Sequence, residues 1–273
     1  MRIGVFAASG PIDGARFQAG QEILESWGHE LRVQPDIQRR LGYLAGTDEQ
    51  RIEALLEAGR GVDIAMAARG GYGLHRILAR VPWEALEAPV LGFSDLTALH
   101  LARFAATGRG GWHGPVVSQL GDLRPEELEA LRRFLEDPGP VEMSGRGGPE
   151  VPVEGTLLGG NLALVSALLG TPWIRWPKDT ILVLEDVDEA PYRLDRMMMQ
   201  LELSGLPDRL QAVALGTFSR CGADGPSVVR ERAEAWGQPV LFDLPFGHGD
   251  RNRAFGVGAR ATMSSGKLRV EAP

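Results

Sequence analysis

The first part of the chain alternates short apolar runs with helical patterns, and this alternation constrains the fold more than any other feature. Strand candidates lie at 3–8, 31–33 and 62–68, and the apolar runs are continuous rather than alternating with polar residues. Continuous apolar strands separated by helical segments are typical of a parallel sheet that helices cover on both faces. Ligands bind such sheets at the carboxyl ends of the strands, so functional residues are expected there.

One of these strand ends carries a serine. Residues 89–100 (PVLGFSDLTALH) predict a strand, a sharp turn and a helix, with Ser94 at the turn. The first N–H groups of the following helix carry a partial positive charge. This is the local structure of a nucleophile elbow, although Leu96 replaces the second glycine of the common G-x-S-x-G pattern. The alternative is that Ser94 only caps the helix.

A second strand end carries the glycine-rich segment 69–73 (RGGYG). Its backbone N–H groups could bind a phosphate or an oxyanion, because glycine leaves the backbone accessible. The spacing matches neither of the common nucleotide-binding loops. A plain tight turn is the third interpretation, and the residues alone do not decide among them.

A serine nucleophile needs a histidine base that a carboxylate orients. The chain has five histidines. His100 lies within the helix after Ser94 and is expected to point away from the turn, and His29 lies in a surface-like Gly-His-Glu segment. The residues alone do not separate the remaining three, which are His75, His113 and His248.

An acid that could orient the imidazole follows the predicted buried strand 180–184. Glu185 and Asp186 stand at its end, where a carboxylate is well placed for this role. The alternative is that both acids lie in a solvated loop.

Composition excludes several functions. The net charge of −7 and the absence of a basic run disfavour nucleic-acid binding, and no apolar run is long enough for a membrane span. Cys221 is the single cysteine, which excludes an intrachain disulfide and fits a reducing cytosol. Its loop position disfavours a nucleophilic role, and no His or Cys spacing indicates a metal site.

The Pro- and Gly-rich stretch that follows the helix predicted near 125–136 indicates a domain boundary. We expect a first domain over 1–140, a linker over 141–155 and a second domain over 156–273. In the second domain, the pattern predicts an apolar helix after Asn161, a helix from Pro191, and strands at 210–218 and 239–243.

Taken together, short stretches along almost the whole chain resemble the LD-carboxypeptidase (muramoyl-tetrapeptide carboxypeptidase) family of serine peptidases, which includes the microcin-immunity peptidases. Each stretch is weak alone, and their common order and spacing carry the resemblance. They are ASGP at 8–11, GYLAGTDE at 42–49, ARGGYG at 68–73, GFSDLTALH at 92–100, HGP at 113–115, GGNL at 159–162, LEDV at 184–187 with APYRLDR at 190–196, and PFGH at 245–248.

The resemblance implies roles for individual residues. Ser94 matches the family's nucleophile, Glu185 its triad acid and His248 its general base, so it separates His248 from the other histidines. The oxyanion donors would be the N–H of Asp95 and a glycine N–H of the 69–73 segment, with Gly71 preferred over Gly70.

The resemblance also implies a fold and a substrate. The fold would be α/β, with a Rossmann-like parallel sheet in the amino-terminal domain and a smaller, mixed, barrel-like carboxyl-terminal domain. The protein would be a cytoplasmic homodimer that needs no cofactor or metal. It would release terminal D-alanine from cytosolic murein tetrapeptide during peptidoglycan recycling.

Two alternatives remain at this point. One is a microcin-immunity-like peptidase or another amide hydrolase of the same family. The other is a non-catalytic small-molecule-binding module, which predicts that Glu185 and His248 lie far from Ser94. The residue that would bind the terminal carboxylate of the substrate is unassigned, with Arg69, Arg196 and Arg251 as candidates and surface salt bridges as the alternative for each.

Overall fold

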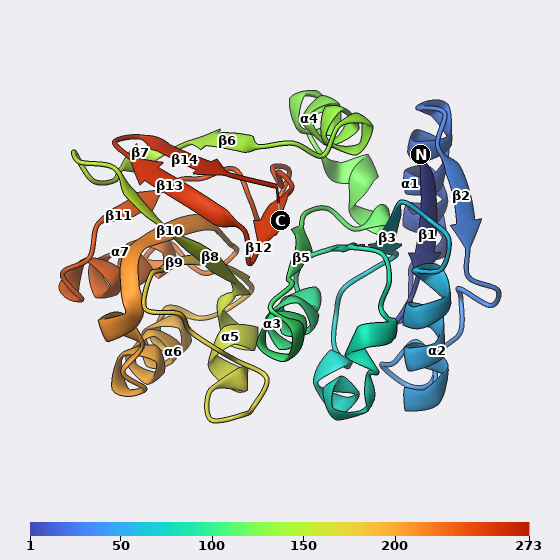
Figure 1. Cartoon of the computed structure of the whole chain (residues 1–273), viewed down its shortest axis with the longest axis horizontal. Helices are drawn as coiled ribbons and strands as arrows, with labels where there is room; N and C mark the ends of the chain where they lie inside the picture. The colour runs from blue at the N-terminus through green and yellow to red at the C-terminus, as the bar shows by residue number, and fades with distance from the viewer. Residues whose placement is uncertain (273) are drawn as a thin grey trace.

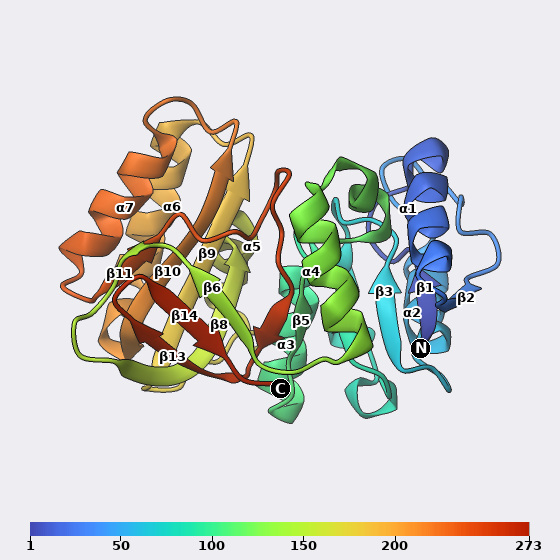
Figure 2. The ribbon, with the colours of Figure 1, turned by 90° about the horizontal axis from the view of Figure 1, so that it is seen from above.

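The computed structural model describes residues 1–272, which form two sheets side by side (Figures 1 and 2). The strand order in the first sheet is β12-β5-β4-β3-β1-β2. All neighbours are parallel except β12, which pairs antiparallel with β5. The predicted parallel sheet is therefore confirmed. Its strands are β1 (Arg2–Phe6), β2 (Glu30–Val33), β3 (Ile64–Ala67), β4 (Val90–Leu91), β5 (Gly111–His113) and β12 (Phe255–Val257).

Helices α1 (Gly14–Ser26), α2 (Asp48–Ala58), α3 (Leu96–Thr107) and α4 (Pro125–Glu136) belong to this half. Helix α2 begins with a capping box: the Gln50 N–H donates to Thr47 Oγ1, and the Thr47 N–H donates to Gln50 Oε1. The residue pattern predicts a helix near 75–80, but the structure has two 3₁₀ turns there, η1 (Leu74–Arg76) and η2 (Leu78–Arg80). Pro82 follows closely and disfavours helical backbone at the residue before it, which limits this segment to short turns.

The second sheet has the order β6-β14-β13-β8-β9-β10-β11-β7. Strands β8 to β11 are parallel to one another, and the outer pairs are antiparallel. Helices α5 (Leu162–Leu168), α6 (Pro191–Leu203) and α7 (Gly225–Ala235) lie beside it (Figure 1). The strands are β6 (Val141–Ser144), β7 (Arg146–Gly147), β8 (Val153–Asn161), β9 (Thr180–Val187), β10 (Leu210–Ser219), β11 (Val240–Phe242), β13 (Arg260–Ser264) and β14 (Lys267–Val270).

The segment expected as a linker, 141–155, is part of this second sheet. It contains β6, β7 and the first residues of β8. The strands β6 and β7 are consecutive in the chain, yet they form the two opposite edges of the sheet. The sheet therefore curls until its edges approach each other, and the mixed α/β character of the fold is confirmed. The division of the chain into domains at this segment remains a prediction.

The two halves share one apolar core. Phe93 and Leu96 of the first half belong to the same buried cluster as Leu158 and Phe246 of the second. In addition, β12 leaves the second half to complete the first sheet beside β5 (Figure 2). This junction lies next to Ser94, which follows Phe93 directly.

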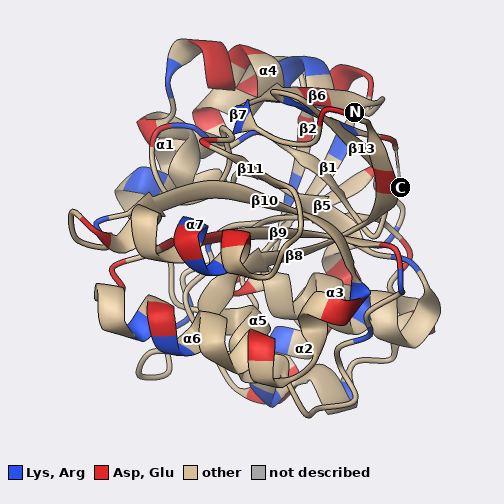
Figure 3. Cartoon of the chain, turned by 90° about the vertical axis from the view of Figure 1, so that its left-hand side faces the viewer, with Lys and Arg blue, Asp and Glu red and all other residues tan. Residues whose placement is uncertain are grey.

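Acidic and basic residues lie side by side on α4, α6 and α7 (Figure 3). Several form pairs four residues apart, such as Arg132 with Glu136 and Arg230 with Glu234. No helix within residues 1–272 combines the length and the hydrophobicity that crossing a membrane requires.

Candidate active site

Ser94 adopts a backbone conformation that is rare for a residue with a side chain. Its φ is +65°, between the end of β4 and the start of α3. A serine with positive φ indicates a backbone that the surrounding structure holds in place. Asp95 is the N-cap residue of α3, and no side chain caps this helix. The interpretation of Ser94 as a helix cap is therefore wrong.

The glycine segment packs directly against this serine. A Cβ atom on Gly70 would lie 3.1 Å from Ser94 Oγ and 2.8 Å from Ser94 Cβ. Gly71 has φ +113°, a conformation that favours glycine, and the N–H of Gly10 donates to Gly70 O at 3.1 Å. The N–H groups of Gly71 and Asp95 donate to no other residue in the range 1–272. Both remain available to an oxyanion beside Ser94.

Asp95 and Arg51 lie against the end of the glycine segment, where a Cβ atom on Gly73 would be 2.7 Å from Arg51 Nη1. Asp95 is fully buried, and its Oδ2 accepts the N–H of Leu74 at 3.0 Å, just after the segment. Burial raises the pKa of Asp95. The buried Arg51 guanidinium donates to Ala8 O at 2.6 Å and to Asp48 Oδ1 at 2.7 Å. No residue pattern marks Arg51 as functional, because it has the place of an ordinary polar residue in a helix.

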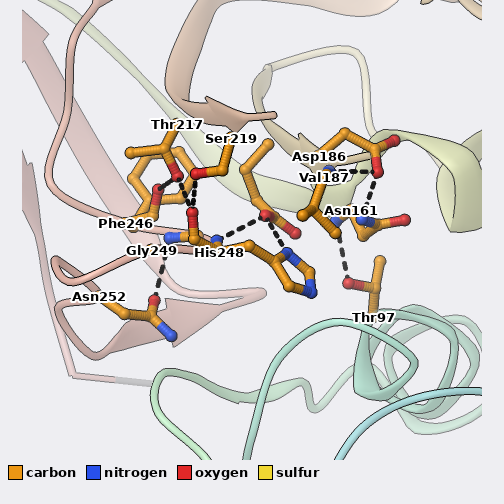
Figure 4. Close-up of polar contacts among 12 residues, drawn as sticks. Thr97, Asn161, Asp186, Val187, Thr217, Ser219, Phe246, His248, Gly249 and Asn252 are labelled. Carbon is orange, nitrogen blue, oxygen red and sulfur yellow. Dashed lines mark hydrogen bonds and ion pairs between the residues drawn. The ribbon is translucent and has the colours of Figure 1, made fainter. Parts of the chain in front are cut away.

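His248 and Glu185 form a close pair in the second half. The Nδ1–H of His248 donates to Glu185 Oε2 at 2.7 Å, and its backbone N–H donates to the same oxygen at 3.1 Å (Figure 4). Glu185 is fully buried within β9, so its placement in a solvated loop is wrong. A carboxylate can only accept, so this contact directs Nε2 away from the acid as the free basic nitrogen.

The pair shifts the titration of both partners. Burial disfavours the charged form of Glu185, but the charge and hydrogen bonds of His248 outweigh it and lower the pKa of Glu185. Burial likewise disfavours imidazolium, but the charge and hydrogen bond of Glu185 outweigh it and raise the pKa of His248 above 6.5. Glu185 is thus held ionised beside a histidine of increased basicity.

Gly247 makes this close approach possible. Its φ is +116°, and a Cβ atom there would lie 2.7 Å from Glu185 Oε2 and 2.7 Å from Thr217 Oγ1. A side chain would therefore displace the carboxylate that accepts both His248 donors. Gly247 is part of the PFGH stretch at 245–248, but only the folded structure shows why glycine is needed there.

Side chains from both halves hold the loop that carries His248. Thr217 Oγ1 donates to His248 O at 3.1 Å, and Asn252 Oδ1 accepts the N–H of Gly247 at 3.0 Å (Figure 4). The Asn252 amide also donates to Gln119 Oε1 at 2.9 Å, and Gln119 lies in η4 (Val117–Asp122) of the first half. No residue pattern points to Asn252 or Gln119, because these contacts join distant parts of the chain.

The fold brings the Glu185–His248 pair to the Ser94 turn. The ring of Phe93, which precedes Ser94, lies 4.6 Å from the His248 ring between centroids. Within residues 1–272, Ser94 Oγ has no hydrogen bond to the imidazole. In substrate-free sites such contacts are often long and tighten when substrate binds. The expectation of the binding-module alternative, that the pair lies far from Ser94, is not met.

The other histidines have different environments. His100 Nε2 lies 2.9 Å from Gly92 O, and burial lowers the pKa of His100 to about 4. His113 stacks on Phe255 at 4.6 Å, and burial lowers its pKa to about 4 as well. Burial also lowers the pKa values of His29 and His75. Of the five rings, all within the described residues, only that of His248 has a hydrogen bond to a carboxylate.

The three arginine candidates for carboxylate binding have different surroundings. Arg69 is exposed and donates to Pro11 O, and Arg196 lies over the Tyr192 ring at 5.6 Å. Arg251 is half-buried, three residues after His248. Among residues 1–272, no group of three or more His, Cys, Asp or Glu side chains has an arrangement that could hold a metal ion.

A strained serine at a strand-to-helix turn, beside free N–H groups and a histidine–carboxylate pair, is the arrangement of a serine hydrolase. The LD-carboxypeptidase N-terminal domain model matches residues 3–114, and the corresponding C-terminal domain model matches 154–263. The chain therefore belongs to the LD-carboxypeptidase family and is a serine-type carboxypeptidase.

Individual relatives agree with this assignment. The murein tetrapeptide carboxypeptidase of Pseudomonas aeruginosa is 35% identical over 98% of this chain and 94% of its own length. The crystal structure of a muramoyltetrapeptide carboxypeptidase from Oxalobacter formigenes superposes with a TM-score of 0.86 at 30% identity, covering 99% of this chain and 98% of the other. The microcin C7 self-immunity protein MccF shares the fold, with a TM-score of 0.88 at 21% identity over 100% and 96% of the two chains.

Proposed function

We propose that this enzyme hydrolyses the L,D peptide bond that releases terminal D-alanine from cytosolic murein tetrapeptide, in peptidoglycan recycling. The observation that carries the proposal is the buried Glu185–His248 pair beside the Ser94 turn. The relatives named for murein peptides support the substrate class. The proposed triad is Ser94, His248 and Glu185.

The reaction begins with proton transfer from Ser94 Oγ to His248 Nε2 as the oxygen attacks the scissile carbonyl carbon. Glu185 keeps the proton of the neutral imidazole on Nδ1 and stabilises the imidazolium that forms. The imidazolium then protonates the leaving amine, the C–N bond breaks and D-alanine departs. Water, deprotonated by His248, hydrolyses the acyl-enzyme and regenerates Ser94.

The N–H groups of Asp95 and Gly71 stabilise the oxyanion in this proposal. Both lack another acceptor within the described residues and flank Ser94 in sequence or in space. Each donor of this kind contributes about 3 kcal/mol to lowering the barrier. Since the donors belong to the backbone, a fixed loop geometry takes the place of specific side chains.

Two further properties belong to the proposal. We place the enzyme in the cytoplasm, consistent with a cytosolic peptide substrate and a single cysteine that needs no oxidising compartment. We also expect a homodimer, as the family resemblance implies. Sedimentation velocity of the purified protein tests the second property.

The direct test is release of D-alanine from purified murein tetrapeptide, with wild type beside Ser94→Ala. Release by wild type that disappears in a folded Ser94→Ala protein would support both the reaction and the nucleophile. Labelling of wild-type Ser94 by a fluorophosphonate without D-alanine release would favour a microcin-immunity-like or other amide substrate. If wild type neither releases D-alanine nor is labelled at Ser94, the proposed catalysis is contradicted.

A further inference from the structure

A buried hydrogen-bonded path joins the nucleophile helix to the strand that carries the proposed triad acid. It starts at Thr97, on the first turn of α3, whose N–H donates to Ser94 O at 2.9 Å. The backbone N–H of Asn161, at the end of β8, donates to Thr97 Oγ1 at 3.0 Å (Figure 4). This contact crosses from the first half of the molecule to the second.

The path continues through the side chain of Asn161. Its Nδ2 donates to Asp186 Oδ1 at 2.9 Å (Figure 4). Its Oδ1 accepts the N–H of Leu164 at 3.2 Å. Asp186 Oδ2 accepts the N–H of Ala163 at 2.9 Å, so the carboxylate uses both oxygens. Asp186 follows Glu185 directly in β9, and Asn161 is the register partner of Glu185.

The approach of the two halves along this path is close. A Cβ atom on Gly160 would lie 2.5 Å from Thr97 Oγ1, and Gly160 has φ +137°, so glycine is required there. Thr97, Asn161 and Asp186 are 1%, 3% and 2% exposed. Polar groups buried this deeply hold a defined geometry only when they are hydrogen-bonded, as these are.

We propose that Thr97 and Asp186 are positioning residues that, through Asn161, hold the Ser94 turn at a fixed distance from Glu185 and its partner His248. The inference rests on the proposed function, because it requires Ser94 and His248 to react together. In this proposal, neither Thr97 nor Asp186 touches the reacting atoms. Their loss therefore slows the attack of Ser94 and leaves substrate affinity almost unchanged, since a small displacement of reacting groups is costly in rate.

The test measures the second-order rate of Ser94 phosphonylation by a fluorophosphonate, together with kcat and KM for D-alanine release per labelled site. Thr97→Val keeps the shape of the side chain and removes the acceptor. We expect labelling and kcat to fall on the order of tenfold, with KM within about twofold. Thr97→Ser retains the hydroxyl and restores both rates.

Two further variants separate positioning from folding. Asp186→Asn replaces one of the two acceptor oxygens by an NH2 group, so either the Ala163 N–H or the Asn161 amide loses its acceptor and a similar loss is expected. Combined with Thr97→Val, it adds little, because both act on one path. Thr107→Val removes a hydroxyl bonded to Arg103 O at the far end of the same helix, and labelling should stay at the wild-type rate.

The outcomes separate the two proposals. If wild-type Ser94 is not labelled, the proposed function fails and this inference falls with it. If wild type is labelled and Thr97→Val has wild-type labelling and kcat per active site, only the inference falls, even if the melting temperature drops. A rise in KM at unchanged kcat would also overturn it, because Thr97 would then act on substrate binding.

Discussion

The two halves of the candidate site are built in different ways. On the Ser94 side, the geometry is made by backbone: a serine at φ +65°, Gly71 at φ +113° and N–H groups without acceptors among the described residues. On the His248 side, it is made by side chains, with a buried carboxylate that accepts two donors. The comparison shows that local chain conformation can prepare a nucleophile, whereas tuning of a base requires a charge brought from elsewhere in the fold.

The largest effect is expected from removing the central group on either side. Ser94→Ala and His248→Gln should each lower kcat on the order of 10⁵-fold, because neither half reacts without the other. The double variant should be no worse than either single variant. Losses that multiply in the double variant would mean that Ser94 and His248 act independently, which would contradict a shared mechanism. Circular dichroism of each variant controls for folding.

Glu185→Gln sharpens the description of the His248 side. We expect kcat to fall on the order of 10³-fold, because the imidazolium loses its counter-charge. In wild type, Glu185 raises the pKa of His248 above 6.5, so activity should fall as the pH drops through that raised value. Removing the charge lowers this pKa, and the acid limb should move to lower pH. If the acid limb of the kcat/KM profile lies at the same pH in wild type and in Glu185→Gln, His248 is excluded as the group that titrates.

Gly247→Ala tests the cost of the close approach. A Cβ atom meets Glu185 Oε2 at 2.7 Å, and φ is unfavourable, so we expect a loss of about 3 kcal/mol in the free energy of unfolding. Gly237→Ala is the matched control, since Gly237 has φ +77° and nothing within 4 Å of its Cβ position. It should lose only about 1 kcal/mol. Urea denaturation compares the two, and equal losses would refute the steric argument.

The smallest effect is expected at Cys221. Its side chain is 1% exposed, and burial raises the pKa of its thiol, so the reactive thiolate is disfavoured. Cys221→Ala should keep D-alanine release within about twofold of wild type. Native protein should also resist iodoacetamide until it is unfolded by urea. Inactivation of the native enzyme by the reagent would point to a thiol that the serine mechanism does not use.

The two halves also differ in how far the sequence alone predicts them. The strand–turn–helix around Ser94 and the helix from Pro125 were both predicted, because each depends on residues close together in the chain. The sharp turn is encoded by an apolar strand that ends in glycine and serine. Local patterns of this kind can be recognised without knowing the rest of the fold.

Much of the second half was not predicted. Strand β8 ends at Asn161 and contains Gly159 and Gly160, and glycine is uncommon in strands. Strands β12 to β14 are short, and only pairing with distant partners stabilises them. Residue patterns also left three histidines open, because His248 meets Glu185 across 63 positions in the chain. Only the family resemblance selected His248, and its role remains a prediction together with those of Ser94 and Glu185.

The pH dependence of Ser94 phosphonylation tests most directly whether a nucleophile from one half is activated by a base from the other. Wild type is treated with a fluorophosphonate from pH 4 to 9, and the labelled residue is identified by peptide mass spectrometry. We predict that the label lies on Ser94 and that its rate falls in acid with a pKa above 6.5. A label on another residue, or a rate that does not change across this range, would contradict the central claim.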